Sequence, residues 1–428
     1  MTISEEKQAR RAGSPGPRRV VITGLGAITP VGHTAPDTWA AFVAGRSGVD
    51  QVASFDVSQY PTRIAAEVKG FDPTAYIPAR EARRMARCSQ LAVVAAREAV
   101  ADAGIDWAQE DRERAGVILG TGMGGTDILI EPISRHARDG AVRVTPYVAL
   151  EHLANMPAFH VSLEHGCLGA LSTVVTACAA GTQAIGDGLE LIRRGRTDIV
   201  LAGGTESQVN MLFFTGFGAM RVLSTRNDEP QAASRPFDAQ RDGFVIGEGA
   251  GMFVLEELEH ARRRGARIYA ELLGQAAGAD AYHIAQPEAT GVGPARTMRW
   301  ALEDAGVAPE DVDYINAHGS ATLQNDLAET AAIKRVFGEH AYRLAVNSTK
   351  SMIGHCFGAA GAVEGLAAVM AVYTDTIHPT INLAEPDPGC DLDYVPNIAR
   401  QRRVNIAISN SFGLGGQNAC IVLGKYTE

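Results

Sequence analysis

Cys178 is the residue of this sequence best placed for covalent chemistry. It lies in Thr176–Gly181 (TACAAG), which directly follows the apolar run Leu171–Val175. We expect a strand that runs into a helix of small residues there, and the N-terminus of a helix favours a thiolate through its unpaired N–H groups and its dipole. A thiol of ordinary pKa is only about 3% ionised at pH 7, so a modest fall in pKa would matter. The segment alone leaves two interpretations open, a nucleophile or a small buried apolar residue.

Two histidines beside glycine offer partners for this cysteine. His318 lies in NAHGSAT (residues 316–322), and His355 ends NSTKSMIGH (residues 347–355). Either histidine, taken singly, could be an ordinary turn residue among the eleven histidines of the chain. A fourth segment, SFGLGGQN (residues 411–418), would offer backbone amides to a developing oxyanion. The four segments together favour the nucleophile interpretation.

Other motifs that would indicate a cofactor are incomplete. Thr29 stands where the third glycine of a dinucleotide-binding motif would follow Gly24 and Gly26, and Thr349-Lys350-Ser351 lacks the glycine-rich start of a P-loop. His355 and Cys356 are adjacent, which is poor spacing for two ligands of one zinc ion. We therefore expect neither a metal nor one of the commonest cofactors.

The composition is that of a globular protein with unusually many glycines. Hydrophobic residues make up 46% of the 428 residues and charged residues 21%, which excludes a disordered chain. The 46 glycines indicate backbone segments that bend tightly or pass close together. The net charge of −10 argues against a nucleic-acid partner recognised through bulk charge. Six scattered cysteines, no signal peptide and no apolar run of about 18 residues predict a reduced, cytoplasmic protein without a membrane partner.

The elements that must position these residues alternate between strand and helix. Short apolar runs end in small or polar residues, which is typical of buried strands in an α/β protein. The predicted strands are 19–23, 115–120, 198–204, 314–319 and 405–410, and helical patterns cover 91–104, 182–194 and 295–306.

An internal repeat predicts two similar α/β halves. Residues 96–105 resemble residues 298–307, at an offset of 202 positions. A second match places Cys178 over His355, at an offset of 177. We predict a loose tail over residues 1–17, one half over 18–265 and another over 266–428. Cys178 and His355 should then occupy equivalent strand-to-helix junctions and face each other.

Four motifs of this sequence resemble those of a known family. TACAAG, NAHGSAT with QNDLAET after it, NSTKSMIGH with GAAGAVE after it, and SFGLGGQNA are similar to the ordered motifs of β-ketoacyl-acyl carrier protein synthases. The similarity is to the elongating branch of the thiolase-like superfamily, and it extends from about Arg19 to Val422. It implies two fused thiolase-like halves with central mixed sheets, an acyltransferase, and substrates carried on the phosphopantetheine arm of an acyl carrier protein without a metal or redox cofactor.

The resemblance also implies roles for individual residues. Cys178 would hold the acyl chain, and His318 and His355 would donate hydrogen bonds to the thioester oxygen of malonyl carrier protein as CO2 leaves. The amides of Cys178 and Leu414 would form the oxyanion hole, and Lys350 would pair with Glu364 to support the histidines. The implied substrate-binding residues are Ser320, Thr322, Phe412 and Leu414.

Departures from the family pattern leave the pathway open. Leu414 stands where elongating synthases usually carry a gating phenylalanine. The segment Gln324-Asn325-Asp326 is similar to the corresponding segment in ketosynthase subunits of type II polyketide synthases. The alternatives are therefore a fatty-acid synthase that acts as a homodimer and a polyketide ketosynthase paired with a chain-length-factor subunit. A non-catalytic, pocket-shaping subunit would typically lack Cys178, and a thiolase would need a second catalytic cysteine, for which Cys420 is misplaced.

An acidic carrier protein would need a local basic patch on this acidic chain. Arg80, Arg84 and Arg87 are spaced to share one helical face, Lys69 is near in sequence, and Arg221 matches a basic position at the family's entrance. We expect these residues to bind the carrier, although an ordinary solvated helix face would show the same spacing.

Overall fold

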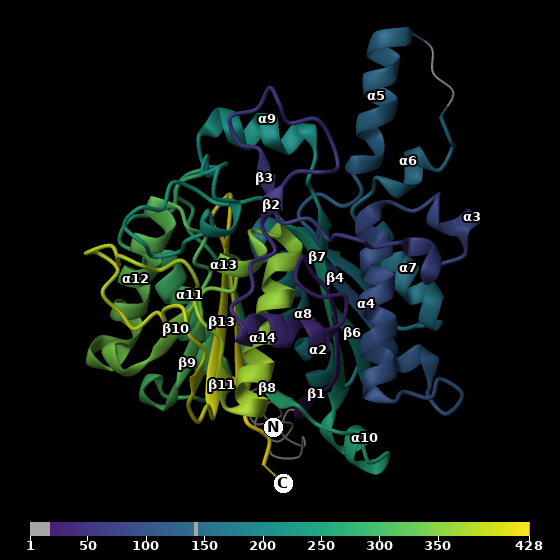
Figure 1. Cartoon of the computed structure of the whole chain (residues 1–428). Helices are drawn as coiled ribbons and strands as arrows, with labels where there is room; N and C mark the ends of the chain where they lie inside the picture. The colour runs from purple at the N-terminus through teal and green to yellow at the C-terminus, as the bar shows by residue number, and fades with distance from the viewer. Residues whose placement is uncertain (1–17, 141–143, 428) are drawn as a thin grey trace, which may run out of the picture.

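The computed structural model describes residues 18–140 and 144–427, so the predicted tail over residues 1–17 lies outside it (Figure 1). In the described part, ten strands form one mixed sheet in the order β10-β9-β13-β14-β8-β1-β7-β6-β4-β5. Their bounds are β1 Val20–Ile28, β4 Ala115–Gly120, β5 Leu171–Val174, β6 Ile199–Ser207, β7 Glu248–Glu257, β8 Ala270–Ala279, β9 Tyr314–Asn316, β10 Ala345–Asn347, β13 Ile406–Gly413 and β14 Gln417–Gly424. Two short ribbons lie outside this sheet, β2 Asp50–Gln51 with β3 Ile64–Ala65 and β11 Thr376–Ile377 with β12 Arg400–Gln401.

The sheet consists of two sets of strands with the same internal order. Outward from the contact between β1 and β8, one set runs β1-β7-β6-β4-β5 and the other runs β8-β14-β13-β9-β10. The first pair of each set is antiparallel, and β4 pairs in parallel with β5 and β6 just as β9 does with β10 and β13. The predicted duplication of an α/β unit is confirmed.

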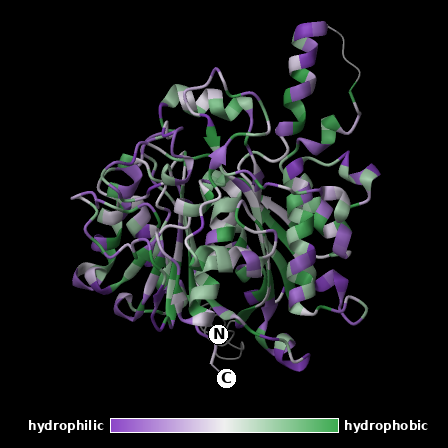
Figure 2. Ribbon diagram, viewed as in Figure 1, coloured by the Kyte–Doolittle hydropathy of each residue, from purple (hydrophilic) through white to green (hydrophobic). Residues whose placement is uncertain are grey.

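Helices cover both sets of strands in layers. α8 (Ala180–Arg193) and α14 (Ala360–Thr374) pack on each other and contact strands of both sets. α4 (Arg87–Ala103) and α7 (Met156–His165) cover the first set, and α11 (Val292–Ala305) covers the second, with α12 (Leu323–Phe337) packed against α11. Residues 357–374, which include α14, are long and apolar enough by composition to span a membrane (Figure 2). Because 83% of that stretch is buried, it is a core helix.

The remaining helices are short or peripheral. α5 and α6 project from the body of the molecule, with α9 nearby at the same end (Figure 1). Their bounds, with those of the others, are α2 Ala35–Val43, α3 Ala79–Ala82, α5 Asp127–Asp139, α6 Val148–Glu151, α9 Met211–Met220, α10 Leu258–Arg263 and α13 Lys350–Ile353.

Of the two sequence matches, the first has the correct register and the second is wrong. α4 and α11 both end at a left-handed glycine, Gly104 and Gly306, which are 202 positions apart as predicted. The turns that precede α8 and α14 are η3 (Ala177–Ala179) and η7 (Phe357–Ala359), so the true offset there is 180 and Gly358 is the counterpart of Cys178. Ala177 and Phe357 share a positive φ of 49° and 45°, which supports this register. A slip of three residues goes unnoticed in stretches of alanine and glycine, because such residues match one another in several registers.

The two turns explain part of the glycine excess. A Cβ atom on Gly358 would lie 2.3 Å from the backbone nitrogen of Gly122, and one on Gly181 would lie 2.8 Å from the carbonyl oxygen of Gly358. Both contacts are too close for any side chain. Glycine therefore allows the starts of α8 and α14 to approach each other, which brings the motifs around Cys178 and His355 together.

Candidate active site

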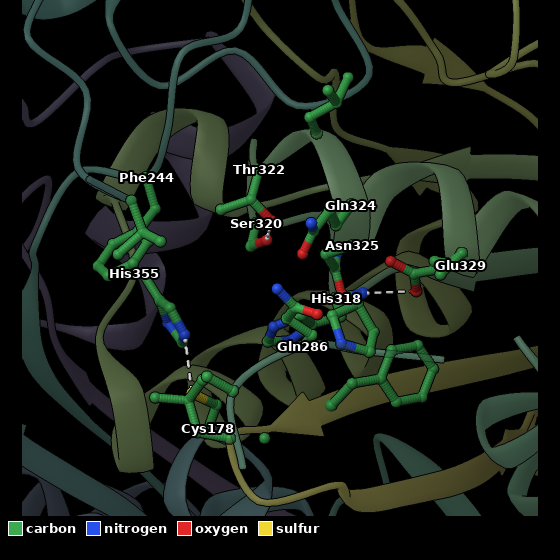
Figure 3. A pocket seen from close by; sticks show the side chains of 18 of the residues that line it. Cys178, Phe244, Gln286, His318, Ser320, Thr322, Gln324, Asn325, Glu329 and His355 are labelled. Carbon is green, nitrogen blue, oxygen red and sulfur yellow. Dashed lines mark hydrogen bonds between the residues drawn. The ribbon is translucent and has the colours of Figure 1, made fainter. Parts of the chain in front are cut away.

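One cavity brings the three predicted catalytic side chains together. It has a volume of about 580 Å³ and is lined by Cys178 in η3, His318 after β9 and His355 after α13. Figure 3 shows His355 directed at Cys178, with His318 beside them in the same cavity. The carboxyl-terminal ends of β5 and β9, one from each set of strands, lead into the segments that carry Cys178 and His318. The site therefore exists only where the duplicated units meet.

His355 is held in one tautomer by its own turn. Its Nδ1 accepts a hydrogen bond from the N–H of Phe357 at 3.2 Å, so the proton of the neutral ring lies on Nε2. Nε2 is 2.9 Å from Cys178 Sγ, and the ring of Phe357 stacks on the imidazole with centroids 4.9 Å apart. Burial, together with the charge of Lys350, holds the pKa of His355 well below its usual value. The ring is therefore a neutral donor toward the sulfur.

Cys178 is buried, and its thiol is less acidic than its position at a helix start predicts. Burial raises the pKa of Cys178 to about 11, and the charge of Lys350 and the N–H of Leu414 oppose this rise only in part. The expected shift toward a thiolate is therefore wrong for the free site, because removal of the sulfur from water outweighs the nearby positive charge.

His318 is fixed through both its backbone and its ring. The carboxylate of Glu329 accepts the N–H groups of His318 and Gly319, each at 2.8 Å. Nδ1 lies 3.3 Å from the ammonium group of Lys350, which can only donate, so the proton of this ring also lies on Nε2. Burial, with the charge of Lys350, lowers the pKa of His318 well below its usual value. The two imidazoles lie edge to face at 5.4 Å between centroids, so the cavity contains two neutral N–H donors.

Lys350 and Glu364 form a buried ion pair at the back of the site. The side chains are 1% and 0% exposed, and Nζ contacts Glu364 Oε1 at 2.5 Å. Nζ also donates to the carbonyl oxygen of His318 at 2.6 Å. The pair that the resemblance implied is present, and it contacts His318 directly.

The predicted substrate-binding residues line the same cavity. The hydroxyl groups of Ser320 and Thr322 lie 2.9 Å apart, and the ring of Phe412 lies 5.8 Å from that of His318. Leu414 is 40% exposed at the cavity wall. A Cβ atom on Gly413 would lie 3.1 Å from the backbone nitrogen of Cys178, so this loop packs directly on the turn of the nucleophile.

The expected basic helical face does not exist. α3 ends at Ala82 and α4 begins at Arg87, so Arg80, Arg84 and Arg87 do not share a helix. Arg87 instead pairs with the buried carboxylate of Glu248 at 2.7 Å and is a structural residue. The interruption is local, because Arg83 to Ala86 leave the helical path.

The other predicted docking residues lie at the surface. Lys69 pairs with Asp50 at 2.6 Å, and Arg80 is exposed. Arg84 lies over the ring of Tyr147 at 4.4 Å. Arg221 is exposed at the end of α9 and lines the cavity. Among these residues, only Arg221 contacts the cavity itself.

Sequence reasoning missed several residues that shape the site. Glu329 lies within the QNDLAET segment but was not singled out, because its burial two turns into α12 cannot be read from the sequence. Burial raises its pKa to about 7. Phe217, Phe244 and Phe357 form an aromatic wall beside Cys178, which no periodic pattern revealed. Cys420 is buried in β14 and does not line the cavity, as the sequence indicated.

No cluster suited to a metal ion is found among the described residues, since no group of three or more His, Cys, Asp or Glu side chains is placed to hold one. The donors in the cavity are instead N–H and O–H groups around a thiol, which is an arrangement for acyl transfer.

Two family models match this chain. The model of the beta-ketoacyl synthase N-terminal domain matches residues 17–261, and that of the C-terminal domain matches residues 269–384. The chain belongs to the beta-ketoacyl synthase family, and its fold is the thiolase-like fold of that family.

Relatives refine this assignment. The chain is 47% identical over 409 residues to 3-oxoacyl-[acyl-carrier-protein] synthase 2 of Synechocystis, covering 96% of this chain and 98% of the relative. Among solved structures, the ishigamide ketosynthase/chain length factor superposes with a TM-score of 0.91 at 38% identity, covering 96% of this chain and 100% of the other. A ketosynthase in complex with its type II polyketide acyl-carrier protein superposes with a TM-score of 0.88 at 36% identity and the same coverage.

Proposed function

We propose that this protein is a 3-oxoacyl-[acyl-carrier-protein] synthase that extends an acyl chain by two carbons in fatty-acid biosynthesis. The observation that carries the proposal is the contact of 2.9 Å between His355 Nε2 and Cys178 Sγ, in a cavity that also holds His318. The identity of 47% to a 3-oxoacyl-[acyl-carrier-protein] synthase 2 over nearly the whole chain supports the same activity.

The first half of the reaction transfers the acyl chain to Cys178. The sulfur attacks the thioester carbonyl of acyl carrier protein, and the proton of the Cys178 thiol leaves with the departing pantetheine thiol. The N–H groups of Cys178 and Leu414 would bind the oxyanion, and the His355 Nε2–H stabilises negative charge on sulfur as the substrate displaces water. The N–H of Leu414 opposes the rise in the pKa of the Cys178 thiol that burial causes.

The second half of the reaction forms the carbon–carbon bond. Malonyl carrier protein loses CO2, and the electron pair of the broken bond produces an enolate whose oxygen accepts hydrogen bonds from His318 and His355. The enolate carbon attacks the acyl group on Cys178, and the released sulfur takes up a proton. Both imidazoles are neutral donors in this site, so they can stabilise the enolate without protonating its carbon.

The carrier protein is the proposed partner at the cavity. Ser320 and Thr322 would bind the pantetheine arm, Phe412 and Leu414 would border the acyl group, and Arg84 and Arg221, with Lys69 and Arg80, would bind the acidic carrier. A related ketosynthase has been solved with its acyl-carrier protein, and Arg221 lies at the cavity itself.

A second copy of a similar chain is the proposed partner at the edge of the sheet. Among residues 18–140 and 144–427, β5 has a neighbouring strand on one side only, and apolar side chains around it are exposed: Leu163 by 66%, Leu168 by 70%, Leu171 by 50% and Val175 by 54%. An open strand edge with an apolar surround favours pairing with another strand. We expect a homodimer. Light scattering should report a dimer in the wild type and a monomer after Leu168→Asp with Leu171→Asp.

A type II polyketide ketosynthase with a chain-length-factor partner is the second candidate, because one similar solved structure is a ketosynthase/chain length factor and another is a ketosynthase with its type II polyketide acyl-carrier protein. Co-purification distinguishes the two. A second chain of similar size that lacks the cysteine would favour the polyketide reaction, and a single chain would favour the fatty-acid reaction.

Two further proposals concern the whole chain. We propose a cytoplasmic location, since all six cysteines are free and buried. We also propose a boundary between the halves at 265/266, which falls between α10 and β8.

The direct test combines purified protein with acyl- and malonyl-carrier protein and reads the products by mass. We expect an acyl adduct on Cys178 that disappears when malonyl carrier protein is added, together with a product two carbons longer. Absence of any adduct on Cys178 would overturn the proposed mechanism.

A further inference from the structure

Glu206 is a completely buried carboxylate that the reaction described above does not use. It lies on β6, and five neutral groups donate to it. They are the N–H groups of Gly122 at 2.5 Å, Gly358 at 3.1 Å and Met123 at 3.3 Å, the hydroxyl of Thr121 at 3.2 Å and the amide of Gln208 at 3.0 Å. Within residues 18–140 and 144–427, it forms no ion pair with a lysine, arginine or histidine. So many donors around one buried carboxylate fix the backbone segments that supply them.

One of these donors belongs to the turn that holds His355. Gly358 follows Phe357, whose N–H donates to His355 Nδ1 and whose ring stacks on the imidazole. Phe357 has a φ of +45°, a left-handed conformation that costs a non-glycine residue free energy and persists only when its surroundings impose it. The hydrogen bond from Gly358 to Glu206 is such a constraint, one residue away from the strained position.

The same carboxylate holds the opposite side of the junction. Gly122 and Gly358 both donate to Oε2 of Glu206, and Gly122 belongs to the loop after β4. A Cβ atom on Gly358 would lie 2.3 Å from the nitrogen of Gly122, so the two backbones are nearly in contact there. Glu206 therefore joins a loop from the first set of strands to the turn of the second set that carries Phe357.

We propose that Glu206 is a positioning residue for the condensation reaction: by accepting the N–H groups of Gly122 and Gly358, it holds the Phe357 turn so that His355 keeps its proton on Nε2, facing Cys178. The inference rests on the proposed function, because it gives His355 its role through that reaction.

The substitution Glu206→Gln tests this role with little change in size. Both carboxylate oxygens accept hydrogen bonds, so an amide would place an NH2 group against at least one donor and leave that donor unpaired. The Phe357 turn should loosen, and the N–H that fixes the tautomer of His355 should be lost for part of the time. The groups that face His355 from neighbouring elements, Cys178, His318 and Lys350, are unchanged by the substitution.

Two measurements report the role. We expect kcat for condensation to fall by about 10- to 100-fold, the size expected when a reacting group is misplaced by a fraction of an ångström to an ångström, with KM for both carrier substrates unchanged. Nitrogen-15 NMR of histidine-labelled protein should show His355 as the Nε2–H tautomer in the wild type and as a mixture of tautomers in the variant. Glu206→Asp, which keeps the carboxyl group but is too short to reach both glycines, should give the same mixture and serves as the second variant if Glu206→Gln does not fold.

Glu98→Gln is the matched control. Glu98 is a largely buried carboxylate that accepts backbone N–H groups from Ala27 at 2.8 Å and Ala35 at 2.7 Å, without a connection to His355. The substitution Glu98→Gln should lower the stability of the protein while leaving kcat and the NMR signals of His355 unchanged. His355→Ala, measured in parallel, separates the two hypotheses: if it retains condensation, the proposed function fails. If His355→Ala loses activity while Glu206→Gln keeps wild-type kcat and a single tautomer, or resembles Glu98→Gln, the inference about Glu206 is overturned.

Discussion

His355 Nε2 lies 2.9 Å from Cys178 Sγ, although the two residues are 177 positions apart and belong to different units of the duplicated fold. Neither unit contains a complete site, because η3 supplies the thiol and the loop before η7 supplies the imidazole. The geometry also assigns separate work to each group. The sulfur forms a covalent bond, whereas both imidazoles, as neutral Nε2–H donors, stabilise negative charge.

This separation predicts that the two half-reactions respond differently to substitution. Cys178→Ala should reduce condensation by at least about 10³-fold, because no acyl-enzyme forms, but should retain release of CO2 from malonyl carrier protein. His318→Ala should reduce CO2 release itself by about 10²- to 10³-fold, the usual cost of one lost donor to a developing oxyanion. Trapping of labelled CO2 alongside product mass measures both steps.

Cys420→Ala is the control for those variants, because Cys420 is a buried cysteine outside the cavity lining. It should leave both half-reactions intact. Equal loss of CO2 release in Cys178→Ala and His318→Ala would contradict the assignment of separate roles.

The buried pair of Lys350 and Glu364 predicts a split between stability and activity. Lys350→Met strands the carboxylate of Glu364 in the core and should cost about 3–5 kcal/mol of unfolding free energy, measured by urea denaturation. Adding Glu364→Leu removes the stranded charge, so the double variant should recover much of that loss. It should not recover kcat, because the contact of 3.3 Å from Lys350 Nζ to His318 Nδ1 remains absent. Recovery of both quantities would show that Lys350 has only a structural role.

The surface arginines predict an electrostatic contribution to carrier binding. Arg84→Glu and Arg221→Glu should each raise KM for carrier-bound substrates by about 3- to 10-fold, with kcat for a free thioester unchanged. Higher salt should likewise raise the KM of the wild type for carrier-bound substrates, because salt screens exposed charges. Arg403→Glu is the matched control, since Arg403 is exposed just before β13, whereas the cavity lies at the far end of that strand. An equal fall in free-thioester turnover would argue against docking.

Local patterns were enough to single out Cys178, His318 and His355, because each lies in a short motif that follows a strand, whereas Lys350 and Glu364 were implied only by the family resemblance. Cys178, His318, His355, Lys350 and Glu364 all come together, and the chain order of strands and helices was sufficient to predict an α/β protein with a repeat. The register of the second repeat failed because small residues carry too little information to fix an offset to within three positions.

Features that depend on tertiary contacts could not be read from spacing. The pKa of Cys178 depends on how completely the surrounding chain removes water from the sulfur, and this burial outweighs the opposing charge of Lys350 and the N–H of Leu414. Arg87 was misassigned because its partner, Glu248, is 161 residues away and buried in the sheet. Glu206 and Glu329 accept backbone N–H groups, and every residue type except proline supplies those, so the sequence does not reveal which glutamate meets them.

A buried histidine behind the active site predicts how stability changes with pH. His378 is completely buried, its Nε2 accepts a hydrogen bond from the hydroxyl of Thr349 at 3.0 Å, and its Nδ1 lies 3.0 Å from the carbonyl oxygen of Pro379. The hydroxyl oxygen of Thr349 also accepts a hydrogen bond from the amide of Asn316 at 2.9 Å, so the hydroxyl proton is available for His378. Protonation of Nε2 would remove the lone pair that accepts this proton, and the hydrogen bond would be lost. Burial lowers the pKa of His378 to about 4, and the Pro379 carbonyl opposes this only in part.

Because the pKa of His378 is lower in the folded than in the unfolded chain, the unfolded chain binds the extra proton as the pH falls below about 6.5. The stability from this group is therefore fully present above that pH and is lost progressively down to about pH 4, a loss of about 3 kcal/mol in all. His378→Phe fits the neighbouring rings of Phe42 and Trp39, and it should lower unfolding free energy at pH 7 while flattening its dependence on pH between 6.5 and 4. Urea unfolding at several pH values measures both effects, with His136→Phe on the exposed side of α5 as the control for the loss of one histidine. Parallel pH curves for wild type and His378→Phe would show that His378 does not carry this dependence.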